Sequence, residues 1–370
     1  MQAKESVKEE AAKEAEEAAA SRAAEEEGSV EEEKVVGEGG EAEAAAEREA
    51  EEVAAKAQEE AAANSAANEK GREERAAEML ALAKAWKPSE HSDDSKDANA
   101  GYYGGFQLTD EATIARMRGA AKELVLMAGK KILNGEFNLT RISFPIKCMC
   151  PKTILQTLSW SQSCMNIYLN HAASLDDKVE RVKLLIVASM ASSYHDKIFE
   201  KPLNPILGET YQSYGQDGSS IVFEQTSHHP PRSHYIVEGP DNNYRGDGSL
   251  SFDIKSNPYS ATVNCVGRRT MVFKDGQKIE YGWISDYLWN IFMGTMSHQY
   301  TGKLEFRDNE NGIYAYFELG AYRMRAQDYL YGHIEKDGEK VCEITGNYMG
   351  YIDFDKVRYW DRRDQEHIHF

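Results

Sequence analysis

The sequence predicts a mainly β, α+β fold, in which a helical lead-in precedes a large, near-complete antiparallel β-barrel. Three observations carry this prediction. Short segments that alternate apolar and polar residues recur every 8–14 residues from residue 210 onward. Asp-Gly and Asn-Gly pairs separate several of these segments. The stretch before residue 200 shows helical periodicity instead. So many antiparallel strands in one domain favour a closed or nearly closed barrel, which at this size can leave an interior cavity.

Eleven strands are expected, because each segment has the period-two pattern of a half-buried strand. They are 220–224, 234–238, 248–255, 261–266, 270–273, 277–281, 300–306, 313–318, 328–334, 340–345 and 349–354. Five dipeptides supply the positive φ that tight hairpins need: Asp217-Gly218, Asp247-Gly248, Asp275-Gly276, Asn311-Gly312 and Asp337-Gly338.

The helical part has three predicted helices. One runs from about Thr109 to Leu133 and is capped by Thr109 or Asp110, and the others cover residues 153–171 and 176–194. The last has the strongest pattern, because apolar residues repeat on one helical face: Leu175, Val179, Val182, Leu185 and Ile186. An extended segment over 137–147 separates the first helix from the second.

Charge divides the chain into two parts. The formal net charge is −19, from 62 acidic and 43 basic residues, and residues 1–100 contribute −16 of it (29 acidic, 13 basic). This acidic Ala/Glu-rich, low-complexity extension is expected to be disordered or a single helix, since its composition cannot bury a core. A short apolar helix over 76–86 and a linker over 87–105 end it. Residues 101–370 form the globular domain. This balance argues against a nucleic-acid binder.

The chain is expected to be cytoplasmic and peripheral at intracellular membranes. Its start lacks the apolar core of a secretory signal, and its longest apolar run, residues 184–188, is far too short to span a bilayer. An odd count of five irregularly spaced cysteines fits a reducing compartment.

The segment Lys201–Glu209, with the sequence KPLNPILGE, is the first candidate site. Pro202 and Pro205 fix φ at two points and push the residues before them out of the helical region. The result is a rigid, extended corner that presents the cation of Lys201 and the amide of Asn204. These groups suit an anionic oxygen cluster such as a phosphate. The alternative is a proline-stiffened loop with a solvated lysine.

The segment Glu224–Pro231, with the sequence EQTSHHPP, is the second candidate site. His228 and His229 would diverge in a regular strand, but at a strand end stiffened by two prolines both can turn toward one ligand. Two imidazoles could then donate to phosphate oxygens. Metal ligation together with His234 is a weaker alternative, because no cysteine or carboxylate lies at a useful spacing. The second alternative is a proline-capped turn in which one histidine is buried and the other is exposed.

Glu224–Pro231 resembles the fingerprint of the oxysterol-binding protein family, with Thr226 where the family has valine. The segment Lys201–Glu209 resembles the family's second motif. Ile142–Lys147 followed by Pro151–Gln156 resembles the entry to its lipid-binding domain. The resemblance covers roughly residues 130–362.

This resemblance implies a hydrophobic tunnel inside the barrel, closed by an N-terminal lid, and a non-enzymatic protein that carries one lipid at a time between membranes, for example at membrane contact sites. The implied cargoes are phosphatidylinositol 4-phosphate and either a sterol or phosphatidylserine. Lys201, Asn204, His228 and His229 would bind the phosphoinositide headgroup. The lid or tunnel entrance would include Leu139, Thr140, Ile142 and Phe144. No cofactor, metal or nucleic acid is implied.

The C-terminus departs from the family pattern. Family members continue into a region that supplies a further Lys, Glu and Arg to the headgroup site, whereas this chain is shortened and ends at Phe370. Arg232, Arg362 and Arg363 are available as substitutes.

Two other functions remain open. One is a lipid sensor or scaffold that binds at membranes without net transfer. The remote one is a glycerolipid acyltransferase, since His171 and Asp176 match a His-x4-Asp pattern. The competing interpretation of that pattern is a polar helix connection with Asp176 as N-cap.

Overall fold

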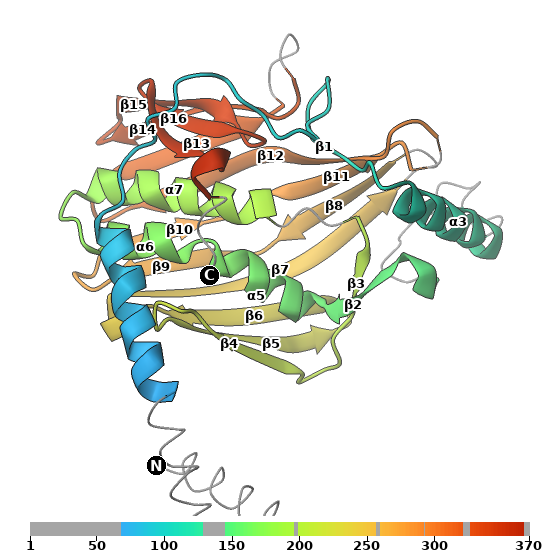
Figure 1. Ribbon diagram of the computed structural model, residues 1–370, viewed down its shortest axis with the longest axis horizontal. Coiled ribbons are helices and arrows are strands. Elements are labelled where there is room, and N and C mark those ends of the chain that lie inside the picture. Colours follow the sequence, from blue (N-terminus) through green and yellow to red (C-terminus); the bar gives the residue numbers. More distant parts are fainter. Residues whose placement is uncertain are drawn as a thin grey trace, which may run out of the picture. The chain divides into compact units, whose positions relative to one another are not determined.

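The computed structural model describes residues 68–128, 145–195, 199–256, 260–291, 293–320 and 326–365. Residues Glu69–Phe370 form one compact unit. A single 15-stranded antiparallel sheet dominates this unit, and helices cover one of its faces (Figure 1). The residues expected at the lid or tunnel entrance lie outside the described residues: Leu139, Thr140, Ile142 and Phe144.

The strands are β1 (Phe106–Gln107), β2 (Met149–Thr153), β3 (Lys201–Leu203), β4 (Thr210–Tyr214), β5 (Ser220–His228), β6 (Pro231–Glu238), β7 (Tyr244–Ser256), β8 (Ser260–Val266), β9 (Arg269–Phe273), β10 (Lys278–Tyr281), β11 (Ser285–Trp289), β12 (Ser297–Asp308), β13 (Ile313–Leu319), β14 (Tyr329–Lys336), β15 (Glu339–Asn347), β16 (Tyr351–Phe354) and β17 (Val357–Asp361). All eleven predicted strands are present. Sequence periodicity missed β1, β2, β3, β4, β11 and β17.

The sheet follows the order β17-β16-β15-β14-β13-β12-β10-β9-β7-β6-β5-β4. Strands β8 and β11 also lie between β7 and β12: β7 pairs with β8, β8 with β11, and β11 with β12. Strand β1 pairs with β12 as well. The predicted near-complete antiparallel barrel is therefore confirmed, with β4 and β17 as its edge strands. Strands β2 and β3 form a separate parallel pair.

The three predicted helices are present, but the one predicted over 153–171 is divided into two at Cys164 and Met165. The helices are α3 (Glu111–Ala128), α5 (Ile154–Ser163), α6 (Asn166–Ala173) and α7 (Lys178–His195). The short helix α8 (Arg362–Gln365) and the 3₁₀ turns η2 (Ile146–Cys148) and η3 (Pro240–Asn242) were not predicted. Asp110 caps α3, as predicted, because its Oδ2 accepts a 2.7 Å hydrogen bond from the Thr113 amide. At α7 the cap is Asp177, not Asp176: its Oδ1 accepts from the Val179 and Glu180 amides at 2.8 and 3.2 Å.

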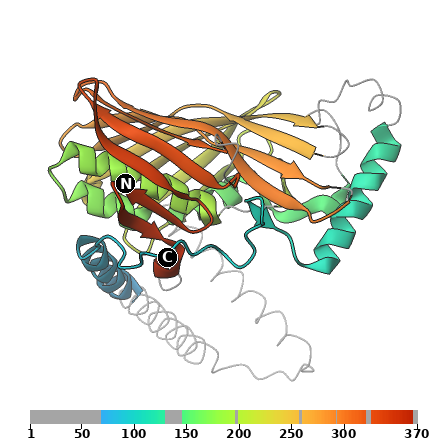
Figure 2. The same ribbon diagram turned by 90° about the horizontal axis from the view of Figure 1, so that it is seen from above.

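Helices α5, α6 and α7 lie against one face of the curved sheet (Figure 2). The alternation along the strands explains why: Phe223, Tyr235 and Phe317 are buried, while their neighbours in sequence are more exposed. These rings join the apolar face of α7 in one continuous core. The Tyr300 hydroxyl donates a 2.8 Å hydrogen bond to the Ser193 carbonyl of α7. Tyr300 of β12 therefore lies on the face of the sheet that the helices cover, which we call the helix-bearing face. None of the described helices combines the length and hydropathy that crossing a bilayer requires.

Four of the five predicted Asp-Gly and Asn-Gly turns are hairpin turns, and their glycines have positive φ. The prediction at Asp247-Gly248 is wrong, because both residues lie inside β7, where they pair with β6 and β9. The reason for the glycine is packing: a Cβ at Gly248 would lie 2.5 Å from Cε1 of Tyr235. Gly248 therefore makes room for a buried ring rather than for a turn.

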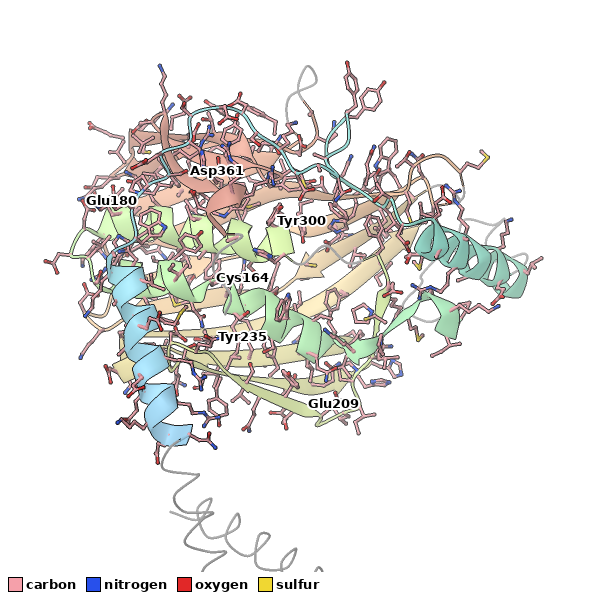
Figure 3. All side chains as sticks on the ribbon, in the orientation of Figure 1. Cys164, Glu180, Glu209, Tyr235, Tyr300 and Asp361 are labelled. Carbon is pink, nitrogen blue, oxygen red and sulfur yellow. The ribbon has the colours of Figure 1, made fainter. Side chains whose placement is uncertain are left out.

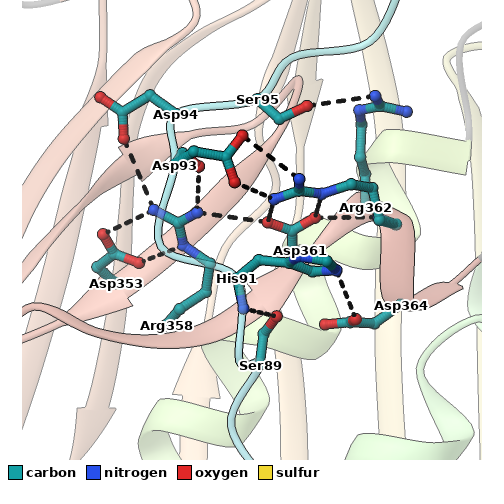
Figure 4. Close-up of polar contacts among 11 residues, drawn as sticks. Ser89, His91, Asp93, Asp94, Ser95, Asp353, Arg358, Asp361, Arg362 and Asp364 are labelled. Carbon is teal, nitrogen blue, oxygen red and sulfur yellow. Dashed lines mark hydrogen bonds and ion pairs between the residues drawn. The ribbon is translucent and has the colours of Figure 1, made fainter.

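The segment over 87–105, expected to be a linker, lies along the C-terminal strands and carries ion pairs (Figure 4). Arg358 on β17 is buried and contacts Asp353 at 2.8 Å, Asp361 at 3.4 Å and Asp94 at 3.6 Å. Arg363 contacts Asp361 at 2.7 Å and Asp93 at 3.0 Å. We call residues 87–97 the strap. Before it, a helix over residues 68–84 contributes Ala83 to the core.

Candidate functional site

Lys201 and Asn204 form the first half of the candidate site. Lys201 begins β3, where it pairs with Met149 of β2, and its side chain is half-buried. Its Nζ donates to the Asn204 Oδ1 at 2.8 Å and to the Pro202 carbonyl at 3.0 Å. Burial lowers the pKa of Lys201 by penalising its charged form. Because the Asn204 oxygen accepts from Lys201, its amide nitrogen is directed away as an exposed donor.

The loop after Asn204 joins this pair to the second motif. The Gly208 amide donates to the Gln225 carbonyl, and the Gln225 amide donates to the Glu209 carbonyl, both at 2.9 Å. Glu209, labelled in Figure 3 at the start of β4, also accepts a 3.0 Å hydrogen bond from the Ile206 amide. The two motifs are therefore connected by backbone hydrogen bonds at Gln225, three residues before His228.

A β-bulge determines where His228 lies. In the β5–β6 ladder Gln225 pairs with Ser233, but Ser227 pairs with Arg232, so Thr226 is the extra residue. The bulge shifts the alternation by one, and His228 then pairs with Pro231, on the face that carries Ser233 and Tyr235. Without the bulge, His228 would follow Glu224 and Thr226 onto the solvent face.

Two polar side chains of the motif support this geometry. Gln225 is 1% exposed, and its Nε2 donates to the Ser227 carbonyl across the bulge at 2.7 Å. The Ser233 hydroxyl donates to the Gln225 Oε1 at 2.6 Å. The Ser227 hydroxyl donates to the Pro230 carbonyl at 2.8 Å and closes the turn. Residue types alone gave no signal for these supporting roles, because they depend on the bulge.

His228 and His229 form the second half of the candidate site. His228 ends β5, and the two-residue turn of His229 and Pro230 leads into β6. The two exposed rings contact each other, with centroids 4.6 Å apart and planes at 63°. Their ring nitrogens can donate to neighbouring oxygens of one anionic group. A hydrogen bond joins Lys201 to Asn204, and a ring contact joins His228 to His229. The loop between Asn204 and β4, which is hydrogen-bonded to Gln225, places both pairs at the same end of the β4–β5 ladder.

His234 is engaged elsewhere. Its Nδ1 lies 2.6 Å from the Thr226 Oγ1 on the solvent face, so the threonine that departs from the family pattern gains a partner. Within the described ranges, no group of three His, Cys, Asp or Glu side chains is arranged to hold a metal ion. The five cysteines, all within those ranges, are thiols.

Two of the three substitute arginines are used by the strap. Arg363 pairs with Asp93 and Asp361, and Arg362 donates to the Ser95 hydroxyl at 3.4 Å. Both therefore serve the strap and β17 (Figure 4). Arg232 lies on β6 opposite Ser227, next to the histidine turn, and its Nε donates to the Ser251 hydroxyl at 3.2 Å.

The acyltransferase pattern has a structural explanation. His171 Nδ1 lies 3.0 Å from the Ala83 carbonyl, and its ring packs on Trp86 with centroids 5.0 Å apart. Burial lowers the pKa of His171. Asp176 is exposed at the α6–α7 connection. His171 thus anchors the helix over 68–84 and Trp86 to α6.

Comparisons with known proteins agree with this fold and these motifs. The sequence profile of the oxysterol-binding protein family matches residues 130–368. Oxysterol-binding protein 9 of Dictyostelium discoideum is 27% identical over 288 residues, which cover 70% of this chain and 67% of that protein. Mouse oxysterol-binding protein-related protein 1 is 29% identical over 221 residues, but the match covers only 23% of that longer protein.

Solved structures show the same fold. The Osh1 ORD domain in complex with ergosterol superposes with a TM-score of 0.54 at 19% identity, covering 76% of this chain and 63% of that one. The Osh3 ORD of Saccharomyces cerevisiae in complex with PI(4)P gives a TM-score of 0.54 at 18% identity, covering 75% and 70%. The profile match spans more than half of the sequence, and the chain belongs to the oxysterol-binding protein family.

Proposed function

We propose that this protein is a lipid-transfer protein that extracts one lipid at a time and exchanges phosphatidylinositol 4-phosphate for a sterol or phosphatidylserine. The observation that carries the proposal is the placement of a lysine–asparagine pair and a histidine pair at one end of the β4–β5 ladder. Relatives of the same fold have been solved with ergosterol, cholesterol and PI(4)P. Exchange would occur at membrane surfaces, with the protein bound peripherally.

The headgroup would be bound by four side chains. Lys201 supplies a cation whose charged form is disfavoured by burial, so an incoming phosphate stabilises that form and gains a charge-assisted hydrogen bond. Asn204 adds its amide donor, and His228 and His229 add ring donors. The bulge and the prolines hold these groups in place before binding, which lowers the ordering cost.

Selectivity would come mainly from these polar groups. Burying acyl chains is worth about 0.8 kcal/mol per CH₂ relative to water, but a lipid leaving a bilayer is already in an apolar medium. The difference between cargoes therefore rests on the headgroup contacts. A sterol has no phosphate for Lys201 and the histidines, so the two cargoes would bind in alternation. The segment that includes Leu139 and Phe144 would cover the entrance.

Lipid extraction tests this function. The purified chain is incubated with liposomes containing phosphatidylinositol 4-phosphate, cholesterol and phosphatidylserine, re-isolated, and its lipids are identified by mass spectrometry. We expect phosphatidylinositol 4-phosphate on the wild type and at least tenfold less on Lys201→Ala and on the double variant His228→Ala/His229→Ala. His234→Ala is the matched control and should extract like wild type. Liposome binding without any extracted lipid would favour a sensor or scaffold instead.

A further inference from the structure

We propose that Asp286, positioned by His298, binds an alcohol hydroxyl of the carried lipid on the helix-bearing face of the sheet. This inference rests on the proposed lipid-transfer function and adds a polar contact that is separate from the headgroup residues. His298 Nε2 lies 2.9 Å from Asp286 Oδ1, and His298 is 2% exposed. The Asp286 side chain remains 24% exposed, so a ligand can reach its carboxylate.

The sheet register places this pair on the inner face. Asp286 on β11 pairs with Tyr300 on β12, and paired residues of antiparallel strands share a face. The Tyr300 hydroxyl bonds α7, so Asp286 faces the same side as α7. His298 is the diagonal neighbour on β12, and its ring contacts Tyr300 at 4.9 Å between centroids.

The surroundings of the pair are apolar. Val263 pairs with Asp286 on its other side, Leu288 pairs with His298, and both are half-buried. Phe199, two residues before Lys201 in the sequence, has its ring centroid 6.2 Å from that of His298. Strands β8 and β11 are more exposed on this face than β13 or β15, whose inward residues are fully buried. One polar pair thus lies on an incompletely covered apolar surface, close to the strand that carries Lys201.

The chemistry of the pair favours a hydroxyl donor. The His298 ring nitrogen contacts one carboxylate oxygen of Asp286, and the weak donor Cys265 Sγ lies 3.6 Å from the other; among the residues that the structure describes, no stronger donor is found at this second oxygen. A carboxylate has about four acceptor positions, and leaving them unmet in apolar surroundings costs free energy. A hydroxyl would meet this demand, whereas a phosphate or carboxylate would be repelled. The hydroxyl could belong to a sterol or to the inositol ring.

The test removes the acceptor from the protein and the donor from the ligand. Asp286→Leu is measured for extraction of cholesterol, of cholestenone, which lacks the hydroxyl, and of phosphatidylinositol 4-phosphate. Asp286→Asn retains an acceptor oxygen and serves as the rescue variant. Asp286→Leu/His298→Phe removes both polar partners, so that no buried group is left unsatisfied. Asp253→Leu, on the opposite face of β7, is the control.

A sterol source predicts that wild type prefers cholesterol over cholestenone about tenfold or more, and that both leucine variants lose this preference while still extracting the phosphoinositide. An inositol source predicts that they lose the phosphoinositide and keep cholesterol. Unchanged extraction of all three lipids by variants with native melting temperatures would overturn the proposal. If wild type extracts no lipid, the transfer function itself fails.

Discussion

The side-chain amide of Gln225 donates a 2.7 Å hydrogen bond to the carbonyl of Ser227 and thereby spans the bulge that turns His228 to the inner face. The bond joins Gln225, which is buried, to the residue that immediately precedes His228. The histidine pair is therefore positioned by residues that would not touch a ligand.

Replacing Gln225 with leucine should disturb both stability and binding. The Ser227 carbonyl and the Ser233 hydroxyl would lose their partners, at a cost of about 1–3 kcal/mol in the free energy of unfolding. Extraction of phosphatidylinositol 4-phosphate should fall toward that of the histidine variant. Urea unfolding and lipid extraction check the two effects. Gln212→Leu, on the exposed face of β4, is the control. Normal extraction by Gln225→Leu would show that the bulge does not need this bond.

Much of the fold was predictable from sequence, since the period-two pattern located eleven strands and Asp110 capped α3 as expected. The failures have physical causes. Strand β3 has only three residues, and β2 does not alternate between buried and exposed residues. Gly248 follows an aspartate without making a turn, because the Tyr235 ring occupies the space of its Cβ. The bulge at Thr226 appears only in the register. The role of Arg363 depends on Asp93, which is far away in sequence.

Alanine at Gly248 should destabilise the protein. The added Cβ would lie 2.5 Å from the Tyr235 ring and 3.0 Å from the Arg268 carbonyl. Overpacking of this kind typically costs about 1–3 kcal/mol, which denaturant unfolding measures directly. In Gly282→Ala the new Cβ would meet only a Leu304 methyl at 3.7 Å, so its stability should be close to wild type. Equal stabilities for the two variants would contradict the packing explanation.

Removing the Arg358 charge should loosen the strap. Arg358→Met leaves Asp361, which is 1% exposed, with Arg363 as its remaining cation, and leaves Asp353 without its 2.8 Å partner. Breaking a buried pair from one side costs about 3–5 kcal/mol, and the lower end is expected because Arg363 remains. Urea unfolding measures the loss. Arg268→Met, which removes an exposed guanidinium 4.0 Å from Glu280, should change stability by less than about 1 kcal/mol.

Acid should selectively weaken one surface network. Hydrogen bonds from Lys303, then Arg307, lower the pKa of Glu305 to about 2, from its ordinary value of 4.5. A depressed carboxyl pKa contributes stability that is complete above the ordinary value and is lost as pH falls toward 2. The contribution should be below about 1 kcal/mol, because the pair is exposed. Melting temperatures of Glu305→Gln should depend less on pH between 4.5 and 2 than those of wild type; parallel curves would contradict this.

The measurement that tests the central claim most directly is exchange between two liposome populations. Donor liposomes contain phosphatidylinositol 4-phosphate, acceptor liposomes contain cholesterol or phosphatidylserine, and a fluorescent phosphoinositide sensor reports transfer. Catalytic amounts of wild type should move the phosphoinositide, faster when the acceptor holds the counter-cargo, and His228→Ala/His229→Ala should be at least tenfold slower. Transfer at the wild-type rate by the double variant would contradict a headgroup site built on the histidine pair.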